Sequence, residues 1–318
     1  MVDRTEGFHM KRIHLYLQAV ALILSLVTGF FGGLLPHRAE RYYAADEIAA
    51  YTAKAEAAYP NGMIIMIGGK FDSDETFRPI LERSLAHVGK QRPHMLYVPT
   101  AAYDNYAGID AHTARFRSAG CETDVLLVSK ETAAAAAEKF AWADIVYAEG
   151  GNLRFLTENW AEKGVYAAAD AALRRGAVLM GFSSGAMCWA DKGWDDTEPE
   201  TFRIIHHGPF FVGMGKDFAY YDCAGLLPFC LVPHFDSINW RSYTYEAETA
   251  GYPSVCIENG AALVYEGGRY SVLSDAGTPT RSVYLFHPAR GIRFVNLRQD
   301  ATLAAVADGE CRTLRANG

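Results

Sequence analysis

From residue 63 to residue 187 the chain alternates short apolar runs with longer amphipathic stretches, and this rhythm restricts the possible folds more than any other feature. The apolar runs have the length and composition of fully buried strands, and the stretches between them have helical periodicity. Strands that alternate with helices form right-handed crossover units in one parallel sheet. We therefore predict an α/β fold built on a doubly wound, mostly parallel sheet.

The individual elements of this pattern can be assigned by range. The expected strands are 63–67, 95–98, 123–128, 145–148 and 176–180. The expected helices are 77–87, 111–119, 132–140 and one long helix over 153–175. In such sheets function collects at the carboxyl ends of the strands. The residues that fall there are Gly68, Gly69, Thr100, Gly150, Gly151, Asn152 and Ser183.

The pattern changes in the C-terminal part of the chain. Residues 191–222 are rich in charged and aromatic side chains and have little periodicity, so we interpret them as an excursion over the carboxyl ends of the strands. The run 225–234 is apolar and ends in a histidine, and 241–250 has a helical pattern. Residues 254–273 predict a C-terminal β-hairpin region that turns at 266–268.

The composition excludes several classes of function. A formal net charge of −7 offers no basic surface to a nucleic acid, so none is expected as a partner. The six cysteines form no C-x-x-C pair, and the adjacent side chains of His206 and His207 diverge, so we predict no metal site and no cofactor. Cys230 and Cys256 lie in apolar, strand-like runs, which indicates buried thiols in a reducing compartment and a cytoplasmic protein; one adventitious disulfide is the alternative.

The first sixty residues differ from the rest. We assign 1–60 to an N-terminal extension and 61–318 to the α/β domain. Residues 15–35 are almost wholly apolar and follow basic residues, a combination typical of a membrane span or a signal-anchor. Two other interpretations are a peripheral helix that packs on the domain and an upstream extension with little function. A membrane-anchored protein is therefore the alternative to a purely cytoplasmic one.

A serine flanked by glycines follows the strand at 176–180, in the sequence Gly181-Phe182-Ser183-Ser184-Gly185. In a Gly-x-Ser-x-Gly turn from strand to helix, the small residues let the backbone fold tightly and project the central hydroxyl away from the sheet. The spacing selects Ser183 as a nucleophile, and Ser184 then supplies a backbone N–H where an oxyanion would develop. The alternative is a glycine-rich turn that only packs strand on helix.

A serine nucleophile requires a base and an orienting acid from elsewhere in the chain. His234 is the best-placed base because it ends an apolar run, although a lone histidine there is more often a satisfied core or turn residue. Glu258 is the expected acid because it ends a buried strand, where an unpaired carboxylate is costly. The rival acids share a position on the polar excursion, and they are Asp195, Asp196 and Glu198.

Four motifs together resemble the peptidase E family of serine peptidases, which holds aspartyl dipeptidase and cyanophycinase. They are Gly150-Gly151-Asn152, Gly181 to Ala186, Gly225 to Pro228 with Pro233 to Asp236, and Ile257 to Ala261. The resemblance covers roughly residues 63–275 and implies a flavodoxin-like three-layer α/β/α sandwich. It implies Ser183 as nucleophile, His234 as base, and an oxyanion hole from the N–H groups of Gly151 and Ser184. Family members have been read with a glutamate that matches Glu258 or with an acid soon after the serine.

The family usually has Ser-Ala at the middle of the turn, where this chain has Ser183-Ser184. The resemblance implies a serine-type peptidase that hydrolyses small peptides, with Asp-X dipeptides as one substrate class, through a Ser-His-Glu triad and an acyl-enzyme. We expect Asn152 and Arg241 to bind substrate. Arg241 follows His234 closely, and a guanidinium matches a carboxylate in a bidentate fork; the alternative is that it caps or solvates the helix it begins.

Two other functions stay open on the same residues. An α/β-hydrolase-type esterase or amidase would use the same turn, but its chain order is serine, acid, histidine, whereas Glu258 follows His234 here. A non-catalytic, membrane-tethered binding domain could retain the fold without the reaction.

Overall fold

The computed structural model describes residues 59–69, 71, 73–105, 108–196, 218–237, 239–243, 254–267, 269–274, 283–286, 295–297 and 312–313. Several sequence-based predictions lie outside these ranges: the apolar segment 15–35, His206 and His207, Glu198, and residues 244–250 of the expected helix. Within the described ranges, no helix combines the length and the apolar character that crossing a bilayer requires.

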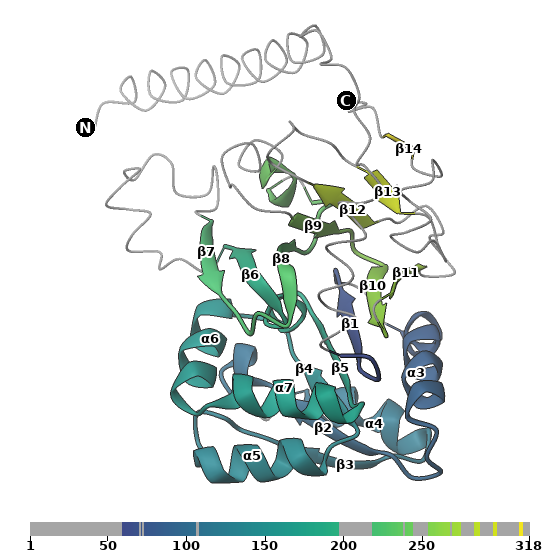
Figure 1. Ribbon diagram of the computed structural model, residues 1–318, viewed down its shortest axis with the longest axis vertical. Coiled ribbons are helices and arrows are strands. Elements are labelled where there is room, and N and C mark those ends of the chain that lie inside the picture. The colour runs from purple at the N-terminus through teal and green to yellow at the C-terminus, as the bar shows by residue number, and fades with distance from the viewer. Residues whose placement is uncertain are drawn as a thin grey trace, which may run out of the picture. The chain divides into compact units, whose positions relative to one another are not determined.

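The first of two sheets has seven strands in the order β11-β10-β1-β5-β4-β2-β3 (Figure 1). Its parallel strands are β1 (Met63–Ile67), β2 (His94–Val98), β3 (Glu122–Val125), β4 (Ile145–Ala148) and β5 (Val178–Phe182). The hairpin of β10 (Ala261–Glu266) and β11 (Arg269–Ser274) extends this sheet, with β10 antiparallel to β1. The predicted turn after Glu266 is present, but the hairpin is shorter than predicted, because Ser254–Ile257 pair with strands of the second sheet described below.

Helices cover both faces of this sheet, as predicted for a doubly wound fold. The helices of one face are α3 (Asp74–Val88) and α4 (Ile109–Ser118), and those of the other are α5 (Ala133–Trp142), α6 (Leu153–Glu162) and α7 (Val165–Arg175). Successive strand residues point to opposite faces. Ile65 accordingly packs in the cluster that contains Phe77 of α3, and Ile64 packs in the cluster that contains Trp160 of α6. The α/β prediction is confirmed.

The long helix expected over 153–175 is wrong in one respect, because it is divided into α6 and α7. Gly164 lies at the break with φ 67° in the left-handed region, which stops one helix and caps the next. Amphipathic periodicity continues across the break because both helices bury their apolar stripes against the same face of the sheet.

A second seven-stranded sheet has the order β14-β13-β12-β9-β8-β6-β7, and it contains the two described ends of the predicted excursion, at residues 191–195 and 219–222. Its strands are β6 (Ala190–Asp195), β7 (Ala219–Asp222), β8 (Leu227–Val232), β9 (Ser254–Ile257), β12 (Val283–Phe286), β13 (Val295–Leu297) and β14 (Arg312–Thr313). In the core of this sheet, β8 pairs in parallel with both β6 and β9. The sequence hides β6 because Asp191, Lys192 and Gly193 interrupt any apolar alternation.

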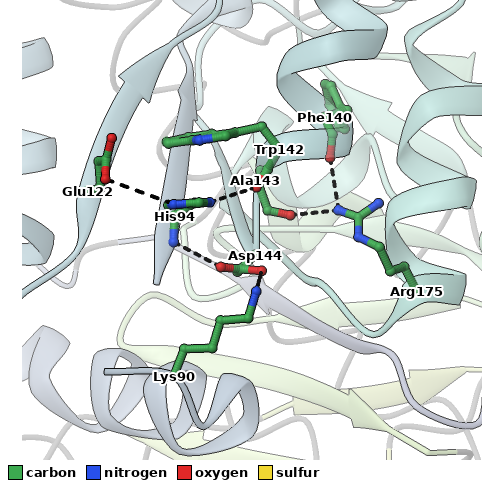
Figure 2. Close-up of polar contacts among 8 residues, drawn as sticks. All are labelled: Lys90, His94, Glu122, Phe140, Trp142, Ala143, Asp144 and Arg175. Carbon is green, nitrogen blue, oxygen red and sulfur yellow. Dashed lines mark hydrogen bonds and ion pairs between the residues drawn. The ribbon is translucent and has the colours of Figure 1, made fainter. Parts of the chain in front are cut away.

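Polar contacts tie the loops together at the amino ends of β2 and β4, opposite the edge where function is expected (Figure 2). Asp144 precedes β4 and accepts hydrogen bonds from the His94 backbone N–H at 3.0 Å and from Lys90 Nζ at 2.7 Å. The Arg175 guanidinium, at the end of α7, donates to the Ala143 carbonyl oxygen at 2.8 Å. This network stabilises the domain without approaching the carboxyl edge.

Asp144→Ala should therefore lower the free energy of unfolding, by about 1–3 kcal/mol, because it removes the acceptor of a partly buried backbone N–H. Urea unfolding followed by circular dichroism would measure the change. Glu158→Ala is the matched control, since its carboxylate lies on the exposed face of α6 and pairs only with Arg154 in the contacts described. An Asp144→Ala midpoint equal to that of the control would contradict the structural role.

Candidate active site

The predicted strand-to-helix turn is present between β5 and α8 (Ser184–Met187). Ser183 stands at its apex with φ 53° and ψ −124°, a conformation that a non-glycine residue rarely adopts. The surroundings hold it there, because its N–H donates to the Ile67 carbonyl oxygen at 3.1 Å. A Cβ at Gly185 would lie 2.2 Å from the Ala148 carbonyl oxygen, so the tight turn requires glycine at that position.

His234 lies beyond the end of β8, and the structure brings it to the serine. Its Nε2 is 2.9 Å from Ser183 Oγ, although the two residues are far apart in sequence. His234 also has a left-handed backbone, with φ 52°, and its N–H donates to the Gly68 carbonyl oxygen at 3.1 Å. The imidazole packs against the Trp240 ring, with centroids 5.3 Å apart. The predicted nucleophile and base thus have the contact that proton transfer requires.

The group that contacts the other ring nitrogen is an amide. His234 Nδ1 lies 2.8 Å from Asn259 Oδ1. Asn259 is in turn fixed by Asp236, whose Oδ1 accepts from both the Asn259 backbone N–H and the Asn259 side-chain Nδ2 at 2.8 Å each. Asn259 is 6% exposed, so these contacts are shielded from water. A chain of hydrogen bonds therefore runs from Ser183 through His234 and Asn259 to Asp236.

The prediction of Glu258 as the acid differs from this geometry by one residue. Glu258 directly follows β9 and Asn259 begins the turn toward β10, and the two side chains have different partners. The Glu258 carboxylate is buried and accepts a hydrogen bond from the Tyr284 hydroxyl at 2.9 Å. Its Oε1 also lies 4.0 Å from a guanidinium nitrogen of Arg241.

Arg241 lies in the short helix η2 (Trp240–Ser242), which follows the histidine along the chain. Its backbone N–H donates to the Ser237 carbonyl oxygen at 2.9 Å, and its side chain is 55% exposed. The guanidinium therefore reaches solvent while one nitrogen faces the Glu258 carboxylate.

The two predicted oxyanion residues are joined to each other. The Ser184 hydroxyl is buried and donates to the Gly151 carbonyl oxygen at 2.7 Å, across the gap between β5 and the loop after β4. Among the described residues, the backbone N–H of neither Gly151 nor Ser184 has a hydrogen-bond acceptor. Two such donors beside a nucleophile suit the charge that develops on an attacked carbonyl oxygen.

Asn152 is predicted to bind substrate, and both polar atoms of its side chain form hydrogen bonds with other residues of the protein. It is the N-cap of α6, where Oδ1 accepts from the Phe155 N–H at 2.8 Å. Its Nδ2 donates to the Tyr103 hydroxyl at 2.8 Å. Tyr103 is 59% exposed and has φ 60°, directly after the helical turn η1 (Thr100–Ala102). Sequence reasoning missed Tyr103; its only signal was the position of Thr100 at a strand's carboxyl end.

The rival acid Asp195 has a structural position. It is 1% exposed, and its Oδ2 accepts from the Leu153 N–H at 3.3 Å, at the start of α6. A carboxylate near a helix N-terminus is stabilised by the unpaired N–H groups and by the helix dipole. Asp195 therefore supports the helix that begins beside Gly151. Asp196 directly follows β6.

A half-buried polar pair, Glu149 and His112, lies beside the serine turn, on the face covered by α4. Glu149 follows β4, and its Oε1 lies 3.8 Å from His112 Nε2. The His112 ring stacks on Phe182, the residue before the nucleophile, with centroids 6.0 Å apart. Burial raises the pKa of Glu149, while burial and the nearby Arg115 lower the pKa of His112. Both groups are therefore shifted toward their neutral forms.

No metal-binding cluster is present in the described ranges, where no three or more histidine, cysteine, aspartate or glutamate side chains converge. The cysteines Cys188 and Cys256 are buried, which raises the pKa of each thiol well above its ordinary value. Burial raises the pKa of the Cys230 thiol to about 12. At neutral pH these thiols are protonated and poor nucleophiles.

The chain matches a family model, a curated protein and a solved structure. The model is described as Peptidase family S51 and matches residues 63–273. The chain is 27% identical over 135 residues to the uncharacterized peptidase YgaJ of Bacillus subtilis (strain 168), covering 42% of this chain and 59% of that protein. It is similar to the crystal structure of a peptidase from an acI-B1 Actinobacterium, with a TM-score of 0.55, 16% identity, and coverage of 77% of this chain and 97% of that chain. The structural match shows a shared fold.

Gly69→Ala should lower the reactivity of Ser183 while leaving the domain folded. A Cβ there would lie 2.4 Å from His234 Cε1 and 2.5 Å from Asn259 Oδ1, so it would push the imidazole away from Ser183. A displacement of this size lowers reactivity about 100-fold. The rate of Ser183 labelling by a fluorophosphonate probe measures the effect.

Gly89→Ala is the control, because Gly89 also has a positive φ but has open space around its Cβ position. The control should label at the rate of the unmodified chain. Unchanged labelling of Gly69→Ala would show that the ring does not occupy this position in solution.

Proposed function

Because the chain belongs to peptidase family S51, we propose that it is a serine peptidase that hydrolyses small peptides through an acyl-enzyme. The observation that carries this proposal is the 2.9 Å contact between Ser183 Oγ and His234 Nε2, on a turn that holds the serine with φ 53°. Strained residues cluster at functional sites, and function in a parallel sheet collects at the carboxyl ends of the strands. Contact between a histidine and a strained serine at that edge therefore favours a catalytic role over a structural one.

The proposed reaction begins with attack of Ser183 Oγ on the peptide carbonyl carbon while His234 Nε2 accepts the hydroxyl proton. The N–H groups of Gly151 and Ser184 stabilise the oxyanion. His234 then gives its proton to the leaving amine, and the C–N bond breaks. A water molecule, deprotonated by His234, attacks the acyl-enzyme and releases the peptide's acyl portion as a carboxylic acid. No cofactor enters these steps.

The proposed substrates are small peptides with an acidic residue, of which Asp-X dipeptides are one class. Two features support this choice. The Arg241 side chain is more than half exposed, and its planar guanidinium matches the geometry of a substrate carboxylate. The exposed Tyr103 ring, held through its hydroxyl by Asn152, offers a rigid aromatic surface beside Gly151.

Ser183→Ala should reduce peptide hydrolysis by at least about 10³-fold and abolish fluorophosphonate labelling, because it removes the nucleophile. Ser184→Ala should reduce kcat only about tenfold. It retains the backbone N–H but loses the hydroxyl that holds the Gly151 carbonyl oxygen at 2.7 Å. Steady-state kinetics on a dipeptide panel, with circular dichroism as the folding check, make the comparison. Losses of equal size would refute the assignment of Ser183.

Arg241→Met should raise KM for Asp-X dipeptides about tenfold and leave Ala-X dipeptides nearly unchanged, because a charge-assisted contact is lost only with the acidic substrate. Arg241→Lys should recover part of the loss, since an ammonium carries the charge but not the planar fork. Equal effects on both substrates would show that Arg241 acts by holding Glu258, and would leave the acidic-peptide proposal without its residue.

A further inference from the structure

The hydrogen bonds behind His234 have a direction that can be deduced from their chemistry. The Asn259 backbone N–H can only donate, so Asp236 Oδ1, 2.8 Å away, is an acceptor. The same oxygen lies 2.8 Å from the Asn259 side-chain amide, which therefore presents its NH₂ group to Asp236. The amide oxygen is left facing His234 Nδ1 at 2.8 Å. Asp236 thus determines which way the Asn259 amide points.

An amide oxygen has no proton to give, so His234 Nδ1 must carry one to make this contact. In the neutral imidazole, a proton on Nδ1 leaves a lone pair on Nε2. Nε2 is the nitrogen that lies 2.9 Å from Ser183 Oγ. Asp236 therefore orients the Asn259 amide, and the oriented amide oxygen selects the Nδ1-protonated ring. In that tautomer the Nε2 lone pair can accept the serine proton.

We propose that Asn259 and Asp236 together are the positioning residues of the site, and that they fix the tautomer and orientation of His234. This inference rests on the proposed peptidase function only for its kinetic consequence, because the tautomer exists without substrate. Asn259 supplies a neutral contact, and the negative charge that favours the protonated imidazole comes from Asp236, one side chain further away. No proton moves to either residue during the reaction, as in triads where the third member stays unprotonated.

The backbone around the pair is built to hold this arrangement. The Gly260 N–H donates to the Gly69 carbonyl oxygen at 2.7 Å, and the Phe235 N–H donates to the Ile257 carbonyl oxygen at 3.0 Å. The first bond fixes the turn that carries Asn259 against β1. The second fixes the loop that carries Asp236 against β9. Both segments are therefore placed by main-chain contacts that side-chain substitutions at 236 and 259 leave intact.

A charge-swap experiment on the full chain tests the pair. Asp236→Asn can offer its NH₂ group as well as its oxygen, so the Asn259 amide loses its fixed direction; kcat should fall at least tenfold with KM within about twofold. Asn259→Asp places a second carboxylate against Asp236 and should also lower kcat, because like charges repel at this distance. In a serine–histidine–aspartate triad, the wrong histidine tautomer lowers kcat by about 10⁴-fold. This value is the largest loss of kcat expected for either single variant.

The double variant Asn259→Asp with Asp236→Asn reverses the polarity of the contact. The new carboxylate accepts from His234 Nδ1, and the new amide donates to it, so kcat should return to within about tenfold of the unmodified chain. A purely structural pair would give no such rescue. Asp110→Asn is the control, because the Asp110 side chain is 99% exposed and lies outside the site. A double variant as impaired as the worse single variant would overturn the proposal.

Nitrogen NMR of ¹⁵N-histidine-labelled protein supplies a readout that needs no substrate. The His234 signals are assigned by their loss in His234→Gln. The neutral ring should be protonated at Nδ1 in the unmodified chain, and Asp236→Asn should convert part or all of it to the Nε2-protonated form. An Nε2-protonated ring in the unmodified chain would overturn the inference even if peptides are hydrolysed. An Nδ1-protonated ring in a chain that hydrolyses no peptide would support the inference and refute the proposed function.

Discussion

The arrangement of the site depends on main-chain hydrogen bonds at Gly68 and Gly69, the two residues that follow β1. At Gly68 and Gly69, main-chain hydrogen bonds join two separate segments to the end of β1: the His234 N–H donates to Gly68 O, and in the segment 260–261 the Gly260 N–H donates to Gly69 O while Ala261 O accepts from the Gly68 N–H. The neighbouring Ile67 carbonyl oxygen accepts from the Ser183 N–H. One strand end therefore sets the relative positions of Ser183, of His234 and of the residues that contact the far side of the histidine ring. Each of these bonds is between backbone atoms, so the geometry is specified before any catalytic side chain is chosen.

This junction explains why strained residues persist. Ser183 and His234 both have positive φ values, and each such conformation costs about 1–3 kcal/mol for a non-glycine residue. The backbone bonds on either side over-determine both conformations, and the core of two packed sheets provides the stability that offsets them. The close approach leaves no room for a side chain at Gly69, whose Cβ would collide with the imidazole. The same close approach of backbone segments therefore causes the strained conformations of Ser183 and His234 and the need for glycine at position 69.

The sequence predicted β1, β2, β4 and β5 because each is largely an apolar run, whereas β3 is polar and its predicted range was shifted toward the apolar residues 126–128. It predicted the turn at Ser183 because a Gly-x-Ser-x-Gly spacing between a strand and a helix is typical of a nucleophile turn. It did not reveal the second sheet, since β6 mixes charged residues with glycine and its burial comes from tertiary contacts. Amphipathic period also cannot show a break such as Gly164, where two helices share one apolar face. The choice between Glu258 and Asn259 required a register accurate to one residue. The chemical preference for a carboxylate pointed to Glu258, whereas the side chain that contacts His234 Nδ1 is that of Asn259.

The use of an amide at Asn259 follows from the charges around it. Glu258 is its neighbour in sequence and Asp236 lies against its side chain, so a carboxylate at 259 would add a third negative charge to a buried turn. Closely spaced carboxylates cannot all ionise without a large free-energy cost. The amide avoids this by donating to Asp236 and accepting from His234. Glu258 is then available to hold Arg241 and the Tyr284 hydroxyl. The two carboxylates therefore act at separate ends of the site. Asp236 orients the residue behind His234, and Glu258 lies near Arg241, the cation that we propose binds the substrate.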